Sequence, residues 1–557
     1  MNIMNGVARV NLNVEKPALT GSGGRESLAS ASAGRPVRMN RWWLALAIVG
    51  TLLNSSGAFA YTTNMVEKVA DLTFYLDENQ AGHGGTAPKN SFTQVGTQIW
   101  FTTSGGGYYG AGTVSLFDLP THQVEEVASL NDTTGGYPYG SLLVLGNEGY
   151  FTTSTDGGSN RGTIAQIDLP SGNVTPLFTF PNNGQPTGEI PRASLTQIGN
   201  ALWTITELGG ISNRGVVVNY NLTNGVTTVV TNLDGPHLGA EAFSGFTAVS
   251  SNAWYFDTFA GGNTFKTTDY LTNVQLDGSI AIITNSMPIG VGTLELLTFD
   301  SLGNPNVANV LSLPGGYDEF PALPPILVGT NSLYFTSVGL NAQPGAILRY
   351  DISTGLLTNL FSFSTNALPS TLYGTRPGYS GLTEWQGELY FINWFGGIYS
   401  TGPNTGGGTV AKFNIASNTV IKLADLGNTS DPTDDLGSPS GFYGTGTIVQ
   451  ETNRFYVYYP LTSGGANNIG TIIRVLLPPQ PIQLVGLGVT NATNVNISWS
   501  GGYPPFDVLT NGDLSLAVTN WPVAITNITS TINTTNWSAT LPLPVGSTFF
   551  RIRGQAQ

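Results

Sequence analysis

Short apolar runs separated by glycine- and asparagine-rich turns recur along most of the chain. One copy has a short lead at 91–96, an apolar run at 99–103, a glycine-rich stretch, and further runs at 112–119 and 124–130. Apolar and β-branched residues in runs of this length, bounded by turn residues, predict strands. Four strands that recur with a period of roughly 50 residues are typical of the blades of a β-propeller.

An aromatic residue marks the second strand of each copy. It is found at Trp100, Tyr150, Trp203, Tyr255, Tyr334, Tyr390 and Tyr456. Seven second strands predict an all-β fold with a seven-bladed β-propeller over residues 61–477, and a pair of β-sandwiches is the alternative. The fourth copy is irregular, because 259–291 adds two strand-like runs that we interpret as an inserted hairpin. The segment is too short for an eighth blade.

The two ends of the repeat region complement each other. The last copy has its third strand at 470–476 and then runs into Pro478 and Pro479, with no fourth strand. The missing run appears at 66–72, whose sequence closely matches 124–130. An open blade would expose unpaired backbone groups at its edge. We therefore expect the N-terminal strand to complete the last blade and to close the ring.

The glycine-rich part of the repeat resembles a known kind of tandem repeat. Residues 102–114 combine a triple glycine, paired tyrosines and a Gly-Thr-Val strand, and 137–142 and 190–195 form the leads into the next copies. This pattern resembles the repeats of GloVer-type exported bacterial proteins, over residues 64–477 and most clearly in the first copies. The resemblance implies secretion and a repeat architecture, and it supplies no catalytic residues.

The first 60 residues have the character of a signal peptide. Arg35, Arg38 and Arg41 precede an apolar run at 42–53, and the small-residue triplet at 58–60 resembles a cleavage site. The run is short for a membrane span, and translation could begin at Met39. We expect 1–60 to be removed and the mature chain to be exported without a transmembrane segment, to the periplasm, the cell surface or the medium.

The composition limits which reactive groups and binding partners the protein can have. The chain has no cysteine, which excludes disulfides, thiol nucleophiles and thiolate metal ligands. Only 10% of its residues are charged and its net charge is −14, which argues against nucleic acid and anionic membranes as partners. Abundant Asn, Thr, Ser and Gly suit contacts with a glycan or a protein. We expect a monomer that requires no cofactor.

A second domain follows a proline-rich linker at 478–483. Residues 484–557 contain short alternating runs that predict a small fibronectin-III-like or immunoglobulin-like β-sandwich. The run at 499–506 and the Phe-Phe-Arg-Ile-Arg ending resemble C-terminal modules of exported proteins from Verrucomicrobia-like bacteria. Trp499, Trp521 and Trp537 fit core positions better than platforms for sugars.

Candidate functional residues lie on the crossings from one blade to the next. His83 and His237 occupy matching places in two copies, on the face where the central mouth of a propeller opens. Solvated loop positions are the alternative. The candidate binding mouth consists of His83, Tyr137, Glu189, Arg192, His237, Asp318, Arg376 and Tyr379.

An acidic stretch near residue 430 suggests calcium. Asp431, Asp434 and Asp435 supply carboxylates among neutral oxygens, and hard oxygen ligands suit Ca²⁺. The spacing does not match an EF-hand, and an exposed acidic loop is the simpler explanation of the stretch. Calcium is therefore the one cofactor that the sequence raises.

Two classes of function fit these observations. The first is an exported or cell-surface recognition protein that binds a glycan or protein on one propeller face. The second is an extracellular polysaccharide lyase or hydrolase with its site at the mouth. Only three histidines exist and no Gly-x-Ser-x-Gly elbow appears in a strand-to-helix context. We therefore favour binding and assign no catalytic residue.

Overall fold

The computed structural model describes two compact units. The larger comprises 62–451 and 455–477, and the smaller comprises 1–61, 452–454 and 478–557. The described residues are 66–78, 81–182, 186–262, 290–314, 320–339, 344–363, 373–398, 406–427, 435–451, 454–479, 482–490, 494–502, 506–512, 516, 520–528, 536–542 and 549–553, with the strands 5–8, 270–274 and 280–284 as backbone. Within these residues, no helix has the length and apolar character needed to cross a membrane.

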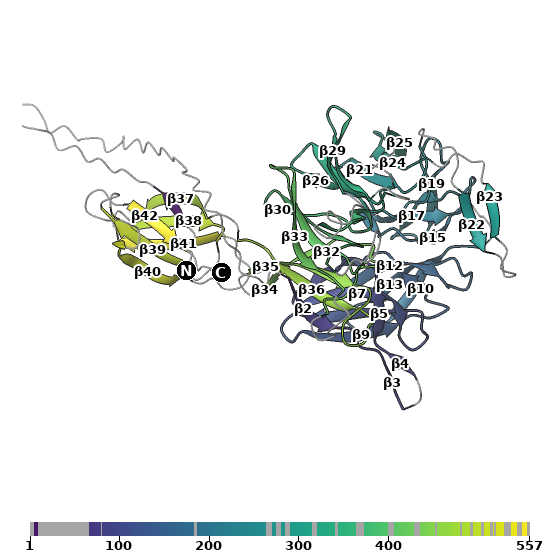
Figure 1. Cartoon of the computed structure of the whole chain (residues 1–557), viewed down its shortest axis with the longest axis horizontal. Helices are drawn as coiled ribbons and strands as arrows, with labels where there is room; N and C mark the ends of the chain where they lie inside the picture. Colours follow the sequence, from purple (N-terminus) through teal and green to yellow (C-terminus); the bar gives the residue numbers. More distant parts are fainter. Residues whose placement is uncertain are drawn as a thin grey trace, which may run out of the picture. The chain divides into compact units, whose positions relative to one another are not determined.

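The chain is all-β, and the described part of the larger unit contains seven antiparallel sheets of four or five strands, numbered here in chain order (Figure 1). The first three sheets each have a divided first strand. The first sheet consists of β5 (Gly85–Pro88), β6 (Thr93–Val95), β7 (Gln98–Gly106), β8 (Thr113–Asp118) and β9 (Gln123–Ser129). The second consists of β10 (Gly136–Pro138), β11 (Leu143–Leu145), β12 (Glu148–Thr155), β13 (Thr163–Asp168) and β14 (Val174–Thr179). The third consists of β15 (Glu189–Pro191), β16 (Thr196–Ile198), β17 (Ala201–Leu208), β18 (Val216–Asn221) and β19 (Thr227–Asn232).

The other four sheets have four strands each. The fourth sheet consists of β20 (Thr247–Ser250), β21 (Ala253–Thr258), β24 (Thr293–Phe299) and β25 (Pro305–Ser312). The fifth consists of β26 (Ile326–Val328), β27 (Ser332–Ser337), β28 (Ala346–Asp351) and β29 (Leu356–Ser362). The sixth consists of β30 (Thr383–Trp385), β31 (Glu388–Asn393), β32 (Thr409–Asn414) and β33 (Thr419–Asp425). The seventh consists of β34 (Thr447–Glu451), β35 (Arg454–Leu461), β36 (Thr471–Leu476) and, from the other end of the unit, β2 (Val66–Asp71).

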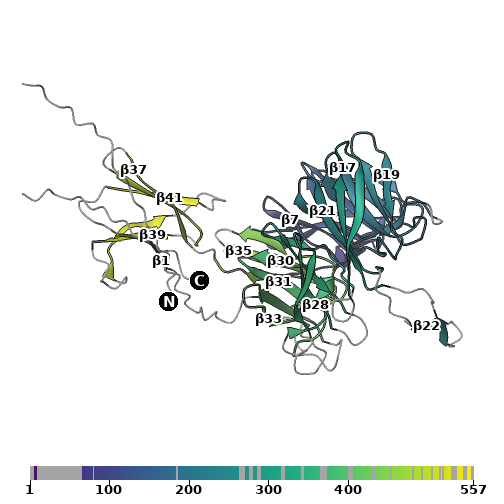
Figure 2. The ribbon, with the colours of Figure 1, turned by 90° about the horizontal axis from the view of Figure 1, so that it is seen from above.

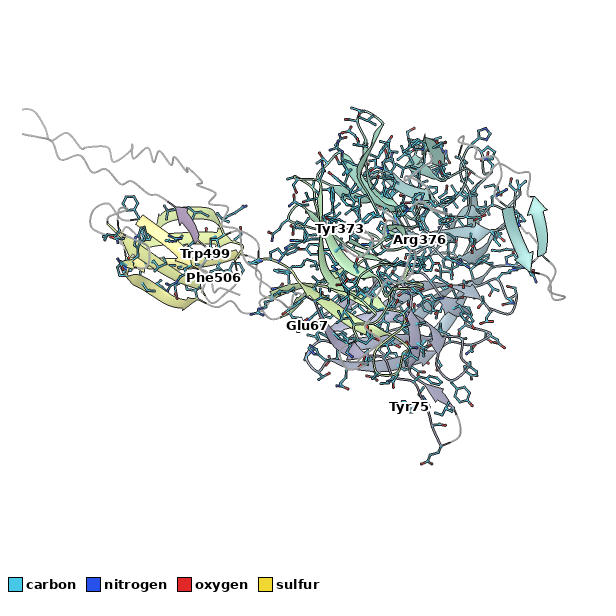
Figure 3. The ribbon with its side chains drawn as sticks, viewed as in Figure 1. Glu67, Tyr75, Tyr373, Arg376, Trp499 and Phe506 are labelled. Atoms are coloured by element: carbon cyan, nitrogen blue, oxygen red, sulfur yellow. The ribbon has the colours of Figure 1, made fainter. Side chains whose placement is uncertain are left out.

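Two hairpins stand outside these sheets. β3 (Tyr75–Leu76) pairs with β4 (Gly82–His83) directly after β2, and Tyr75 on β3 is labelled in Figure 3. β22 (Tyr270–Val274) pairs with β23 (Ile280–Thr284) between β21 and β24. The two runs expected within the insertion at 259–291 therefore pair with each other, and Figure 2 shows β22 apart from the neighbouring sheets.

Each sheet buries both of its faces, which explains the unbroken apolar runs of the second strands. On β7, Trp100 packs against the second sheet, where it meets Phe151. Its neighbour Phe101 points to the opposite face and packs against Tyr456 and Tyr458 of the seventh sheet. Comparable clusters fill the other junctions between consecutive sheets. Burial of apolar area at these junctions supplies the main stabilisation of the unit.

The strand β2 takes the same place in the seventh sheet as a fourth strand takes in the others. It runs antiparallel to β36, with Val66 opposite Val475 and Asp71 opposite Thr471. The backbone N–H of Leu72 donates to the carbonyl of Gly470 at 2.9 Å. In the first sheet, Leu130 donates to Gly112 with the same distance and register. The close sequence match between 66–72 and 124–130 thus corresponds to matching hydrogen bonds.

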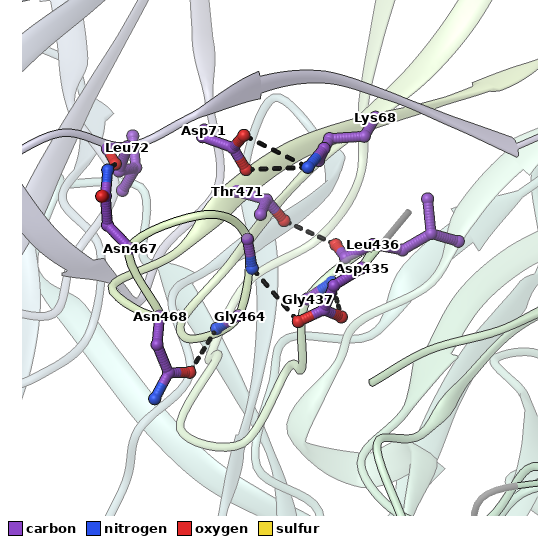
Figure 4. Close-up of polar contacts among 11 residues, drawn as sticks. Lys68, Asp71, Leu72, Asp435, Leu436, Gly437, Gly464, Asn467, Asn468 and Thr471 are labelled. Atoms are coloured by element: carbon purple, nitrogen blue, oxygen red, sulfur yellow. Dashed lines mark hydrogen bonds and ion pairs between the residues drawn. The ribbon is translucent and has the colours of Figure 1, made fainter. Parts of the chain in front are cut away.

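Side chains near the end of β2 reinforce its attachment (Figure 4). The Asn467 amide donates to the Leu72 carbonyl at 3.1 Å, and Lys68 pairs with Asp71 at 3.1 Å. Near the start of β2, the guanidinium of Arg474 on β36 bridges Glu67 of β2 and Glu451 of β34, each at 2.6 Å. The arginine therefore ties β2 to the strand farthest from it in the sheet.

Hydroxyl groups link the innermost strands from one sheet to the next. The N–H of Thr445 in the seventh sheet donates to the hydroxyl of Ser91 in the first at 2.7 Å. The N–H of Ser91 donates to Ser141 in the second sheet at 3.1 Å, and the N–H of Ser141 donates to Ser194 in the third at 2.9 Å. These bonds satisfy backbone donors where the first strands are interrupted.

The smaller unit packs two sheets over one core. β37 (Gln483–Thr490), β38 (Asn494–Ser500) and β41 (Asn536–Pro542) form one sheet. β39 (Phe506–Asn511), β40 (Val523–Ile528), β42 (Phe549–Arg553) and β1 (Asn5–Ala8) form the other. Trp499 is fully buried against Phe506, with ring centroids 5.4 Å apart (Figure 3). Trp521 is also buried, so both tryptophans are core residues.

The strand β1 was not expected from the sequence. Its four residues lie within the segment assigned to the signal peptide, and they pair antiparallel with β42, with Asn5 opposite Arg553 and Ala8 opposite Phe550. The apolar run at 42–53 and the candidate cleavage site lie outside the described residues.

Candidate functional site

In six of the seven sheets, a recurrent bend lies within or shortly before the first strand. A residue other than glycine adopts a left-handed backbone there, with φ between 50° and 61°, and it precedes a proline in all but one of these sheets. These residues are Ala87, Tyr137, Ile190, Glu241, Phe320 and Arg376. Such a conformation is costly for residues with a Cβ and needs support from surrounding contacts. The N–H of Tyr137, for example, donates to the Ala111 carbonyl of the preceding sheet at 2.9 Å.

Side chains that follow this bend converge from different sheets. Tyr443 of the seventh sheet is their common neighbour, with ring centroids 5.7 Å from Tyr139 and 5.4 Å from both Tyr379 and Trp394. Tyr443 also lies 6.4 Å from Phe243 of the fourth sheet. Tyr379 stacks on Trp394 at 3.9 Å. We call these five rings, together with Lys89, Arg192 and Glu207, the central cluster.

Two cations contact one ring of the cluster. The Lys89 ammonium lies 4.5 Å from the centroid of Tyr139 and donates to its hydroxyl oxygen at 2.9 Å. The Arg192 guanidinium lies 4.9 Å from the same centroid and 5.5 Å from that of Phe243. Cations over aromatic faces gain attraction from the ring quadrupole, about 0.5–2 kcal/mol each. The Tyr139 ring therefore contacts both cations as well as the aromatic ring of Tyr443.

Arg192 has a carboxylate partner, Glu207 on β17. The Arg192 Nε and Glu207 Oε2 atoms are 3.0 Å apart, and the two side chains are 30% and 16% exposed. Burial raises the pKa of Glu207, the charge of Arg192 opposes that rise, and the nearby Glu241 adds to it. The pair is thus partly shielded from water and sits beside the aromatic rings.

The cluster keeps contact with solvent although it is densely packed. Lys89, Tyr139, Phe243, Tyr379 and Tyr443 are half-buried, and only Trp394 is buried. Burial raises the pKa of the Tyr443 hydroxyl, and the neighbouring Tyr379 and Tyr139 add to the rise. Tyr443 therefore remains a neutral phenol that can donate and accept hydrogen bonds.

Two of the residues proposed from sequence belong to the central cluster, namely Arg192 and Tyr379. Arg376 lies on the bend before Tyr379, with its guanidinium 5.4 Å from the Phe395 ring, and is labelled in Figure 3. Tyr137 lies on a bend as well, and its side chain is 46% exposed. Glu189 is buried and pairs with Arg161 at 3.1 Å.

The two histidines lie on separate structural features. His83 is on the β3–β4 hairpin, where its ring stacks on Tyr75 at 5.3 Å and its Nε2 atom is 3.6 Å from Asp77. The side chain of His237 is 77% exposed and bonds to Asp234 at 2.8 Å. Neither contact involves a residue of the central cluster.

The acidic candidates are only partly described. Asp318, Asp431 and Asp434 lie outside the described residues. The Asp435 carboxylate is buried and accepts the N–H groups of Gly437 at 2.9 Å and Gly465 at 3.2 Å (Figure 4). Among the residues that the structure describes, no group of three or more His, Asp or Glu side chains is placed to hold a metal ion.

Most of the central cluster was absent from the set predicted by sequence. Tyr139, Glu207, Phe243, Trp394 and Tyr443 were not selected. A usable signal does exist: Lys89, Tyr139, Arg192 and Tyr443 each stand two residues before a hydroxyl residue that links the innermost strands. This spacing of two residues can be recognised only once the linking hydroxyl residues are known.

Comparisons with known proteins give loose similarities. No family model and no curated protein matches the chain. Among solved structures, an oligogalacturonate lyase in complex with manganese has 12% identity and a TM-score of 0.41, over 74% of this chain and 97% of that one. A puromycin-hydrolyzing peptidase of Mycobacterium tuberculosis has 11% identity and a TM-score of 0.40, over 78% and 58%. TolB from Acinetobacter baumannii has 12% identity and a TM-score of 0.27, over 69% and 78%. Likenesses at this level carry no argument about the activity of this chain.

Proposed function

We propose that the seven sheets are the blades of a closed β-propeller of the GloVer repeat type. The Leu72 bond to Gly470 and the Thr445 bond to Ser91 support closure, since both join segments from opposite ends of the repeat region. The shared core between the first and seventh sheets supports it as well. We further propose that 1–60 directs export and that 484–557 is a fibronectin-III-like or immunoglobulin-like module.

The function we propose is recognition of a ligand at the central cluster by an exported binding protein. The observation that carries this proposal is the convergence of Tyr139, Phe243 and Tyr443 from three different sheets beside two cations. Half-buried aromatic rings with a polar edge combine apolar contact with hydrogen bonding. They also dominate binding energy where they cluster.

A glycan is the ligand class that the cluster favours over a protein. A sugar ring offers an apolar face to an aromatic ring and hydroxyl groups to its polar neighbours. The central cluster supplies both kinds of partner, because neutral phenols lie next to Lys89 and Arg192. The surface is also poor in charge, with charged residues at only 10% of the chain. A protein ligand is the competing outcome in the test below.

The test is a glycan-array screen of residues 61–557, followed by calorimetric titration of hits against variants. Y443A should weaken binding by about tenfold or more, because it removes the ring shared by four aromatic neighbours. Y443F should retain most of the affinity, since the ring stays in place. The control is Y108A, because Tyr108 is an exposed tyrosine that contacts Tyr109 rather than the cluster.

The outcome of the variants decides the proposal. Circular dichroism should show the same fold in all three proteins. A Y443A protein that is folded and binds as tightly as the unmodified chain would exclude the central cluster as the site. Binding to a protein partner but to no glycan would assign the site to the other ligand class.

A second candidate function is cleavage of the glycan at the same site. The contact between the Lys89 ammonium and the Tyr139 hydroxyl favours it, because a phenol held in place by a cation can take part in proton transfer with a bound sugar. To test for cleavage, each polysaccharide that binds is incubated with the protein. The mixture is then assayed for new reducing ends and for unsaturated products. Cleavage by the unmodified protein that is lost in Y139F would support a lyase or hydrolase. If the unmodified protein leaves the polysaccharide intact, binding remains the function.

A further inference from the structure

Lys89 differs from the other charged residues of the central cluster in lacking a carboxylate partner. Among the described residues, no Asp or Glu oxygen lies within 4.0 Å of its ammonium, whereas Arg192 is paired with Glu207. Lys68, Lys412 and Lys422 also have carboxylate partners, at 2.7–3.1 Å. Lys89 is half-buried, so its charge is only partly compensated by water.

The surroundings of Lys89 orient its ammonium toward the cluster. One of its donors is used by the Tyr139 hydroxyl, and the charge lies over the Tyr139 ring. The Tyr443 backbone N–H donates to the Lys89 carbonyl at 2.6 Å, which holds the segment of Lys89 against that of Tyr443. An ammonium has three donors, so the remaining two can bind a ligand.

We propose that the central cluster binds a glycan that carries a carboxylate, and that Lys89 pairs with this group. This inference rests on the proposed function, since it names the class of glycan for the same site. The sugar ring would lie against the aromatic rings of Tyr139 and Tyr443. The carboxylate would accept from Lys89, while Arg192, which contacts the same Tyr139 ring, stays paired with Glu207.

The charge balance limits the ligand to a sparsely acidic glycan. The cluster has one cation in excess, because Glu207 neutralises Arg192. The whole chain has a net charge of −14 and would repel a densely charged polyanion. At 0.1 M salt, the interaction of the ligand with charges more than about 10 Å away is screened. The direct ion pair between its carboxylate and Lys89 is screened much less. One uronic acid residue among neutral sugars therefore matches the site better than an all-acidic chain.

A matched pair of oligosaccharides tests the inference. The probes are a tetrasaccharide with one glucuronic acid residue and the same tetrasaccharide with that carboxyl reduced to an alcohol. Calorimetry on residues 61–557 should give an affinity about tenfold higher for the acidic probe, as expected for one charge-assisted hydrogen bond. K89Q should remove this preference, so that the two probes bind the variant with equal affinity.

Controls separate this inference from the proposed function. K68Q removes one positive charge from the Lys68–Asp71 pair of β2, away from the cluster, and should keep the preference. Equal affinities for the two probes, or a preference that persists in K89Q, would overturn the role of Lys89 while glycan binding stands. Binding of neither probe, nor of any array glycan, would overturn the proposed function itself.

Discussion

Burial of single carboxylates sets the pH response of the larger unit. Glu295 on β24 is fully buried, and burial raises its pKa to about 7, against opposing hydrogen bonds from Thr293 and Asn309. The amide of Asn309 donates to its Oε1 atom at 3.0 Å. Because the folded state holds this proton more tightly than the unfolded state, Glu295 contributes stability below about pH 4.5 that is lost as pH rises to about 7.

We predict that E295Q flattens this pH dependence. Gln keeps an oxygen for Asn309 and has no charge to bury, so the free energy of unfolding should rise at pH 8 by on the order of 2–3 kcal/mol and change little at pH 4.5. Urea unfolding of residues 61–477 at both pH values measures the difference. An equal effect at the two pH values would show that Glu295 is not protonated in the folded protein near neutrality.

Asp351 provides the control of opposite sign. Hydrogen bonds from Ser353, Thr354 and Asn331 lower the pKa of this exposed carboxyl to about 2. Its contribution is present above about pH 4 and lost as pH falls toward 2, so D351N should destabilise at neutral pH and have less effect in acid. The two variants should therefore show opposite trends in the same titration.

Individual site residues were predictable only where their type drew attention. Arg192 was selected because it is a polar residue on a crossing from one copy of the repeat to the next. Tyr139, Phe243 and Tyr443 were not distinguished from the many other aromatic residues, most of which fill the junctions between sheets. Periodicity alone does not separate a ring in the core from a ring that faces solvent.

Among the elements, the strands were predictable because each sheet is buried on both faces. Apolar runs such as 99–103 can be read as strands without knowledge of their neighbours. The divided first strands were not foreseen, since the bend falls on residues such as Ala87, Tyr137 and Ile190 rather than on glycine. Sequence therefore placed candidate residues on the crossings between copies of the repeat, whereas most of the central cluster lies just after the bend near the first strands.

The strand β2 should be essential to the larger unit. A chain that starts at Glu78 loses the pairing to β36 and the Glu67–Arg474 ion pair, and it exposes the edge of β36. We predict that it aggregates or that its melting temperature falls by roughly 5 °C or more. A chain that starts at Thr62 is the control, because it retains the whole of β2.

A peptide can distinguish loss of β2 from general damage. Residues 62–77 added in trans to the chain starting at Glu78 should restore part of the melting temperature by adding a strand to β36. A peptide of the same composition in scrambled order should not. An unchanged melting temperature after deletion of β2 would contradict the proposal that β2 closes the ring.

At the scale of the whole molecule, the all-β class follows from repeated short runs and the absence of long amphipathic segments. The number of sheets follows from counting second strands, but the pairing of β1 with β42 has no sequence signal. Four residues that pair through their backbones leave no distinctive pattern of side chains. If residues 1–60 are removed on export, β42 becomes an edge strand in the mature protein.

The division into two units leads to a prediction about cooperativity. The larger unit builds its cores between consecutive sheets, while Trp499 and Phe506 belong to a separate core in the smaller unit. We predict that limited proteolysis of residues 61–557 cleaves within 478–483, because a proline-rich connection between two cores has few contacts to protect it. The products should be two resistant fragments, 61–477 and 484–557, identified by mass spectrometry.

Calorimetry of the cleaved and intact proteins completes this test. Each fragment should melt at the temperature of one of two transitions in the intact chain, since separate cores unfold independently. A single transition in the intact protein, or loss of the 61–477 fragment immediately after cleavage, would mean that the two cores depend on each other.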